Sequence, residues 1–104
     1  AVDCLQADIT RCGGISGLKR VAALCDARSM DVSAHCAPQA SAQACTSLWH
    51  LRHLEYFHTH NRIEHLVFDG CLEPKPGGVL KPDRSRPGMG LTVKRDDIEK
   101  WRVG

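Results

Sequence analysis

The feature that most constrains this sequence is an alternation of short strand patterns with helical patterns across its first half. Segments 4–9, 30–35 and 51–56 each alternate apolar with polar residues, which is typical of strands that bury one side. Over 15–25, apolar residues recur at three- and four-residue spacing, which indicates an amphipathic helix. Strands that alternate with helices predict parallel β/α units and therefore an α/β fold.

The turn chemistry indicates where the helices begin. Gly13 and Gly14 form a turn after the first strand pattern, and Ser16 is the predicted N-cap of the helix that follows. Pro38 fits the first turn of a second helix that continues through the alanine-rich run 40–45. That run also has a strand-like alternation, but alanine is a strong helix former and a weak strand former, so a helix is favoured.

The second half has a different character. Residues 58–68 predict a short helix that runs into a strand, and 73–90 hold four of the five prolines, which indicates an extended, turn-rich segment. A short strand is predicted at Leu91–Val93 and a terminal helix at Asp96–Arg102. We therefore expect two regions, with β/α units over 1–57 and a C-terminal return segment over 58–104.

Three β/α units cannot close a barrel, because a closed barrel of this type takes about eight strands and ~250 residues. A three-stranded parallel sheet would leave both of its outer edges unpaired. The chain also starts at Ala1, close to strand-like sequence. The expectation is the last part of a TIM-type barrel, incomplete as a stand-alone domain and in need of the missing N-terminal portion of the same protein.

Charge, hydropathy and cysteine usage exclude several classes. The chain has 14 basic and 12 acidic residues, which gives no indication of nucleic-acid binding. No apolar run reaches the ~18 residues of a membrane span. The six cysteines lie mainly in apolar periodic stretches without a CxxC pair, so they predict reduced, mostly buried thiols in a cytoplasmic protein rather than a disulfide framework or a zinc ribbon.

Ionisable residues stand at the carboxyl ends of the three predicted strands. Asp8, His35 and Glu55 fall on the side opposite the apolar positions, and functional groups in barrels collect at this rim. An Asp beside a His fixes the tautomer of the ring and creates an acid/base near neutral pH, while a buried, protonated Glu can donate to a developing oxyanion. The alternative is structural: Asp8 caps the following helix and His35 is a satisfied core histidine.

Four stretches resemble one known family. They are Asp-Ile-Thr-Arg-Cys-Gly-Gly-Ile-Ser-Gly (8–17), Ser-Ala-His-Cys-Ala-Pro (33–38), His-Leu-Glu-Tyr-Phe (53–57) and the region from Phe-Asp-Gly to Met-Gly-Leu (68–91). In order and spacing they resemble the C-terminal end of enolase-superfamily enzymes of the mandelate racemase subgroup. The resemblance implies the last three β/α units of a (β/α)7β barrel, followed by a return segment.

The resemblance also implies roles. His35 would be the general acid/base, Asp8 would orient it at about 2.7–3.2 Å, and Glu55 would hydrogen-bond the enolate oxygen. A magnesium ion would stabilise the enediolate of a carboxylate substrate, and an acid-sugar dehydratase is favoured over a racemase. The subgroup's metal-binding carboxylates and its strand-two lysine have no counterpart here. We therefore expect this chain alone to bind no magnesium at the family site and to be inactive, with a homo-oligomer as the complete enzyme.

A rival hypothesis is a non-catalytic remnant that oligomerises through its open sheet edges. It could also bind a transition metal, because imidazole clusters bind zinc, nickel and copper. The candidate ligands lie between positions 50 and 65: His50, His53, His58, His60 and His65.

Overall fold

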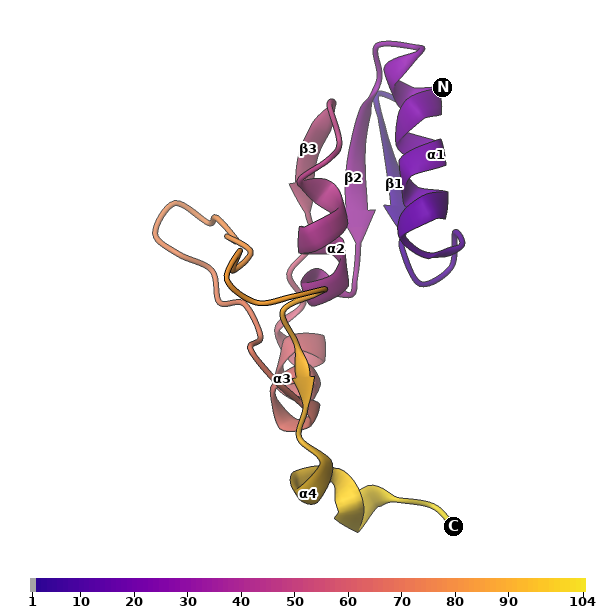
Figure 1. The fold of residues 1–104 in the computed structure, drawn as a ribbon. Helices are drawn as coiled ribbons and strands as arrows, with labels where there is room; N and C mark the ends of the chain where they lie inside the picture. Colours follow the sequence, from indigo (N-terminus) through magenta and orange to yellow (C-terminus); the bar gives the residue numbers. More distant parts are fainter. Residues whose placement is uncertain (1) are drawn as a thin grey trace. The chain divides into compact units, whose positions relative to one another are not determined.

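The computed structural model describes residues 2–104, and the chain divides between Phe57 and His58 into two compact units. The first unit contains a three-stranded sheet of order β1-β2-β3, in which both neighbouring pairs are parallel (Figure 1). Its elements in chain order are β1 (Cys4–Asp8), α1 (Gly14–Asp26), β2 (Asp31–His35), α2 (Pro38–Cys45) and β3 (Leu51–Leu54). The predicted α/β architecture of consecutive parallel β/α units is confirmed.

The core of this unit lies between the sheet and its helices. Ala7 and Ile9 pack with Leu18 of α1 and Ala44 of α2, and Val32 of β2 belongs to a second cluster with residues of α1. Side chains alternate along a strand, so the register that pairs Ala7 with Ala34 also pairs Asp8 with His35 on the opposite face of the sheet. The helices therefore cover one face, and the strand-end polar groups lie on the other.

The structure corrects the predicted start of the first helix. Gly13, not Ser16, precedes α1, with φ of 96°, and no side chain caps the helix. A left-handed residue at this point turns the chain from β1 directly into the helix, and glycine adopts that conformation without a Cβ penalty. The Cβ of any residue replacing Gly17 would collide with the Cys12 carbonyl oxygen, so a second glycine permits this close approach. Helix α1 therefore starts at a left-handed glycine and not at a serine whose hydroxyl caps the backbone.

Two strand ends differ from their predicted limits. β1 ends at Asp8 and β3 at Leu54, so Glu55 lies just beyond its strand. The Glu55 backbone N–H still donates to the Ala34 carbonyl oxygen at 2.9 Å. Glu55 is therefore held beside β2 as if the strand continued.

The second unit contains little regular structure. Its elements in chain order are α3 (His58–Val67), β4 (Phe68–Asp69), β5 (Thr92–Val93), α4 (Arg95–Ile98) and a 3₁₀ turn (Glu99–Trp101). β4 and β5 pair antiparallel, and the intervening chain, which holds four prolines, has one isolated bridge, Lys75 with Val79. The short helix, the turn-rich segment and the final strand are as predicted. The terminal helix begins one residue earlier than predicted and tightens into the 3₁₀ turn.

Cysteine placement and membrane character complete the description. All six cysteines are free thiols, and only Cys25 and Cys45 are buried. The prediction of mostly buried thiols is therefore wrong for the other four, which are partly exposed. None of the helices within residues 2–104 has the length and apolar character that crossing a bilayer requires.

Candidate active site

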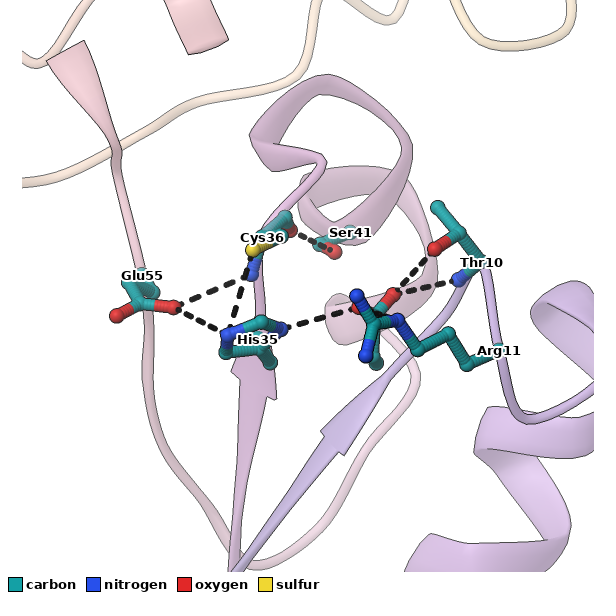
Figure 2. Close-up of polar contacts among 7 residues, drawn as sticks. Thr10, Arg11, His35, Cys36, Ser41 and Glu55 are labelled. Atoms are coloured by element: carbon teal, nitrogen blue, oxygen red, sulfur yellow. Dashed lines mark hydrogen bonds and ion pairs between the residues drawn. The ribbon is translucent and has the colours of Figure 1, made fainter. Parts of the chain in front are cut away.

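The carboxyl ends of β1 and β2 bring an acid and an imidazole together. Asp8 and His35 are register partners, and Asp8 Oδ2 lies 3.0 Å from His35 Nδ1 (Figure 2). The distance is within the hydrogen-bond reach that the sequence predicts. The Asp8 side chain is 10% exposed and the His35 side chain 34%, so the pair lies at a partly open surface. Parallel pairing in register is what delivers both groups to one edge of the sheet.

Asp8 is held by the turn that follows β1. Its Oδ1 atom accepts hydrogen bonds from the Thr10 backbone N–H at 2.8 Å and from the Thr10 hydroxyl at 2.7 Å. Led by the Thr10 hydroxyl, and aided by His35 and the Thr10 N–H, these contacts lower the pKa of Asp8 from 3.8 to about 2, although burial opposes the shift. Arg11 Nε lies 3.4 Å from Asp8 Oδ2. Asp8 is therefore a carboxylate throughout the neutral range.

Glu55 approaches the other side of the imidazole. Its Oε2 atom lies 3.6 Å from His35 Nε2 and accepts a hydrogen bond from the Cys36 backbone N–H at 3.3 Å. Phe57 meets the His35 ring edge-on, with centroids 6.2 Å apart and an interplanar angle of 76°. The structure thus brings all three predicted residues together, with His35 between two carboxyl groups.

Cys36 is a neighbour that the sequence analysis did not single out. Its Sγ atom lies 3.4 Å from His35 Nε2, on the same nitrogen that faces Glu55 (Figure 2). Ser41 Oγ of α2 donates to the Cys36 carbonyl oxygen at 2.9 Å and anchors the turn. In the sequence, the one feature that could have pointed to Cys36 is its position directly after the strand that ends at His35.

The metal-binding capacity of this chain differs from what magnesium needs. Within residues 2–104, the side chains close enough to share an ion are Asp8, His35 and Cys36, whose ligand atoms lie within 4.8 Å of one another. Magnesium prefers six oxygen ligands, whereas this group offers one carboxylate, an imidazole and a thiol. These residues do not fit magnesium.

The histidines between positions 50 and 65 are divided between the two units. His50 Nε2 pairs with Asp26 Oδ1 at 3.1 Å, and His65 Nε2 lies 2.7 Å from Glu73 Oε1. In the described residues of either unit taken alone, no three of these histidines share a ligation site.

Comparison with known proteins identifies the family. The model of the enolase C-terminal domain-like family matches residues 1–98. The chain belongs to this family. A mandelate racemase/muconate lactonizing enzyme-like protein from Rubrobacter xylanophilus is 56% identical, with a TM-score of 0.90 over 95% of this chain.

Other relatives of the enolase family are more distant. An enolase from Bradyrhizobium, complexed with magnesium and mandelic acid, is 27% identical over 98% of this chain, with a TM-score of 0.82. A D-galactarolactone cycloisomerase from Agrobacterium fabrum is also 27% identical, over 99% of the chain. The chain spans 30% of that cycloisomerase and 26–27% of the two structures, so it corresponds to one part of these proteins.

Proposed function

We propose that this chain is the C-terminal part of an enzyme that removes the α-proton of a carboxylate substrate. The observation that carries the proposal is the Asp8–His35 contact of 3.0 Å at the carboxyl ends of neighbouring parallel strands. The missing N-terminal portion of the same enzyme would complete the barrel. A magnesium ion, named in the Bradyrhizobium relative, would be held by that portion, because the residues of this chain do not fit it.

The proposed chemistry follows from the different partners of the two nitrogen atoms of the His35 imidazole. Ionised Asp8 accepts the Nδ1 proton of His35, which leaves the lone pair on Nε2. Nε2 can then take a proton from carbon, and the nearby Asp8 carboxylate stabilises the imidazolium that forms. Glu55 lies 3.6 Å from Nε2. From there a protonated Glu55 carboxyl would donate a hydrogen bond to the substrate oxygen that becomes negative when the α-proton leaves.

The proposal also covers the type of reaction, the oligomeric state and the cellular location of the full-length enzyme. We favour dehydration of an acid sugar over racemisation, because protonated His35 can also deliver its proton to a leaving β-hydroxyl. In the described sheet, the outer edges of β1 and β3 are unpaired, which supports a larger barrel completed by the N-terminal portion. We also propose that the full-length enzyme is a homo-oligomer. The six free thiols support a reducing, cytoplasmic location.

The proposal is tested with His35→Asn in the full-length enzyme. The assay is exchange of the α-hydrogen with deuterium from solvent, followed by NMR on mandelate and a panel of aldonic and aldaric acids. We expect a loss of at least about 10²-fold, because the proton acceptor is removed, with magnesium binding retained. His50→Asn is the matched control, because His50 lies before β3 at the opposite end of the sheet and is 42% exposed, and this variant should exchange normally. Unchanged exchange in the His35 variant, or loss of its magnesium binding, contradicts the assigned role.

A further inference from the structure

The Nε2 atom of His35 is the proposed proton acceptor, yet in this structure it already has a neighbour. Cys36 Sγ lies 3.4 Å away, within the range of a hydrogen bond that involves sulfur. Because Asp8 holds the Nδ1 proton, Nε2 is the acceptor and the thiol is the donor. The thiol also keeps its proton at neutral pH, because burial raises the pKa of Cys36.

The backbone around Cys36 aims the thiol at the ring. Cys36 and Ala37 have φ angles of 54° and 42°, a left-handed pair that is unfavourable for L-residues. Three hydrogen bonds hold the pair in place: Cys36 N–H to Glu55 at 3.3 Å, Ser41 Oγ to the Cys36 carbonyl at 2.9 Å, and Ser41 N–H to the Ala37 carbonyl at 2.8 Å. A strained turn held this firmly is typical of a functional position.

We infer that Cys36 is a removable cap on the proton-accepting nitrogen of His35. This inference rests on the proposed function and adds a residue to it. A substrate α-carbon must come within about 3–3.5 Å of Nε2, which is the space that the sulfur occupies. Substrate entry therefore displaces the thiol. Since S–H is a weak donor, the displacement costs little, whereas a hydroxyl at the same place would hold the nitrogen more tightly.

The cap is tested first without substrate. The full-length enzyme, labelled with ¹⁵N at histidine, is compared with its Cys36→Ala and Cys36→Ser variants, and Cys4→Ala at the opposite end of β1 is the control. We expect the His35 Nε2 resonance to move to higher frequency in the alanine variant and to lower frequency in the serine variant. The control should leave it unchanged. A resonance that is the same in all four proteins overturns the cap.

The second measurement is the rate of α-hydrogen exchange by the same proteins. If the thiol must leave for catalysis, kcat/KM should follow the order alanine, then cysteine, then serine. Serine should be slower than the natural enzyme by about fivefold, the equivalent of one neutral hydrogen bond. The reverse order overturns the cap, because it would show that the thiol assists proton transfer. NMR shifts as expected with no exchange in any protein would contradict the proposed function and leave the cap standing.

Discussion

Two turns in this chain are built alike and lie in very different surroundings. In the first unit, Asp8 Oδ1 accepts from the Thr10 N–H at 2.8 Å and from its hydroxyl at 2.7 Å. In the second unit, Asp83 Oδ1 accepts from the Ser85 N–H at 2.9 Å and from its hydroxyl at 2.7 Å. The local motif is the same Asx-type turn in both places.

The difference lies in what stands across from each carboxylate. Asp8 ends a strand whose parallel neighbour brings His35 to its free oxygen at 3.0 Å. Asp83 lies in the turn-rich segment, where the Ser85 hydroxyl and N–H lower its pKa and the charge of Arg86 adds to the shift. A buried core under the first sheet fixes the distance to His35, whereas the second turn is exposed. The comparison teaches that a local turn can orient a carboxylate, but only the neighbouring strand of the sheet brings a second functional side chain to it.

The largest expected difference between the two turns is catalytic. Asp8→Asn in the full-length enzyme should slow α-hydrogen exchange by about 10³-fold, because an amide no longer selects the Nδ1–H tautomer or stabilises the imidazolium. Asp83→Asn, which makes the same change in the second turn, should exchange at the normal rate. Deuterium incorporation measured by NMR checks both variants. Comparable losses would show that the first turn has no special role.

The second prediction concerns the core that supports the first turn. Leu18 is fully buried between α1 and the sheet, whereas Leu66 of α3 is 50% exposed. Leu18→Ala should lower the free energy of unfolding of the full-length enzyme by about 3 kcal/mol, because it leaves a cavity. Leu66→Ala should change it by less than about 0.5 kcal/mol. Urea denaturation checks the pair, and equal losses would contradict the contrast between the two units.

Much of the first unit could be predicted because its period-two patterns show which residues share a face and where each strand ends. Neighbouring parallel strands bring their carboxyl ends to one edge, so Asp8 and His35, 27 positions apart, were expected there, and the family resemblance implied the same pair. The pattern could not show that the strand ends before Glu55, because the residue keeps its hydrogen bond to Ala34 with or without regular strand geometry.

The start of the first helix and the turn after β2 could not be predicted, because each depends on the left-handed backbone conformation of one or two residues. Ser16 has the right side chain for an N-cap, but the left-handed Gly13 starts the helix earlier. Left-handed geometry at Cys36 is less predictable still, since cysteine shows no preference for it and neighbouring contacts impose it.

The third prediction concerns how the stability that Asp8 contributes depends on pH. The Asp8 pKa is lowered from 3.8 to about 2, so its contribution to stability is complete above pH 4 and is lost as the pH falls towards 2. The shift corresponds to at most about 2.5 kcal/mol of stability. The difference in unfolding free energy between the natural enzyme and Asp8→Asn should therefore shrink over this range. A difference that stays constant from pH 4 to pH 2 would show that the Asp8 charge adds nothing to stability.

The smallest effect is expected from the hydroxyl groups of the turns themselves. Thr10→Val keeps the side-chain shape and the backbone N–H but removes the hydroxyl that contributes most to lowering the Asp8 pKa. The pKa of Asp8 should rise towards 3.8, and stability at neutral pH should fall by about 1 kcal/mol, the value of one hydrogen bond. Ser85→Ala should raise the pKa of Asp83 in the same direction, but with a smaller loss of stability, because Asp83 is exposed whereas the Asp8 side chain is only 10% exposed. Carboxyl ¹³C NMR titration checks both pKa changes. An unchanged Asp8 pKa in the valine variant would assign the shift to His35 rather than to the turn, and the two turns would then differ even in their local chemistry.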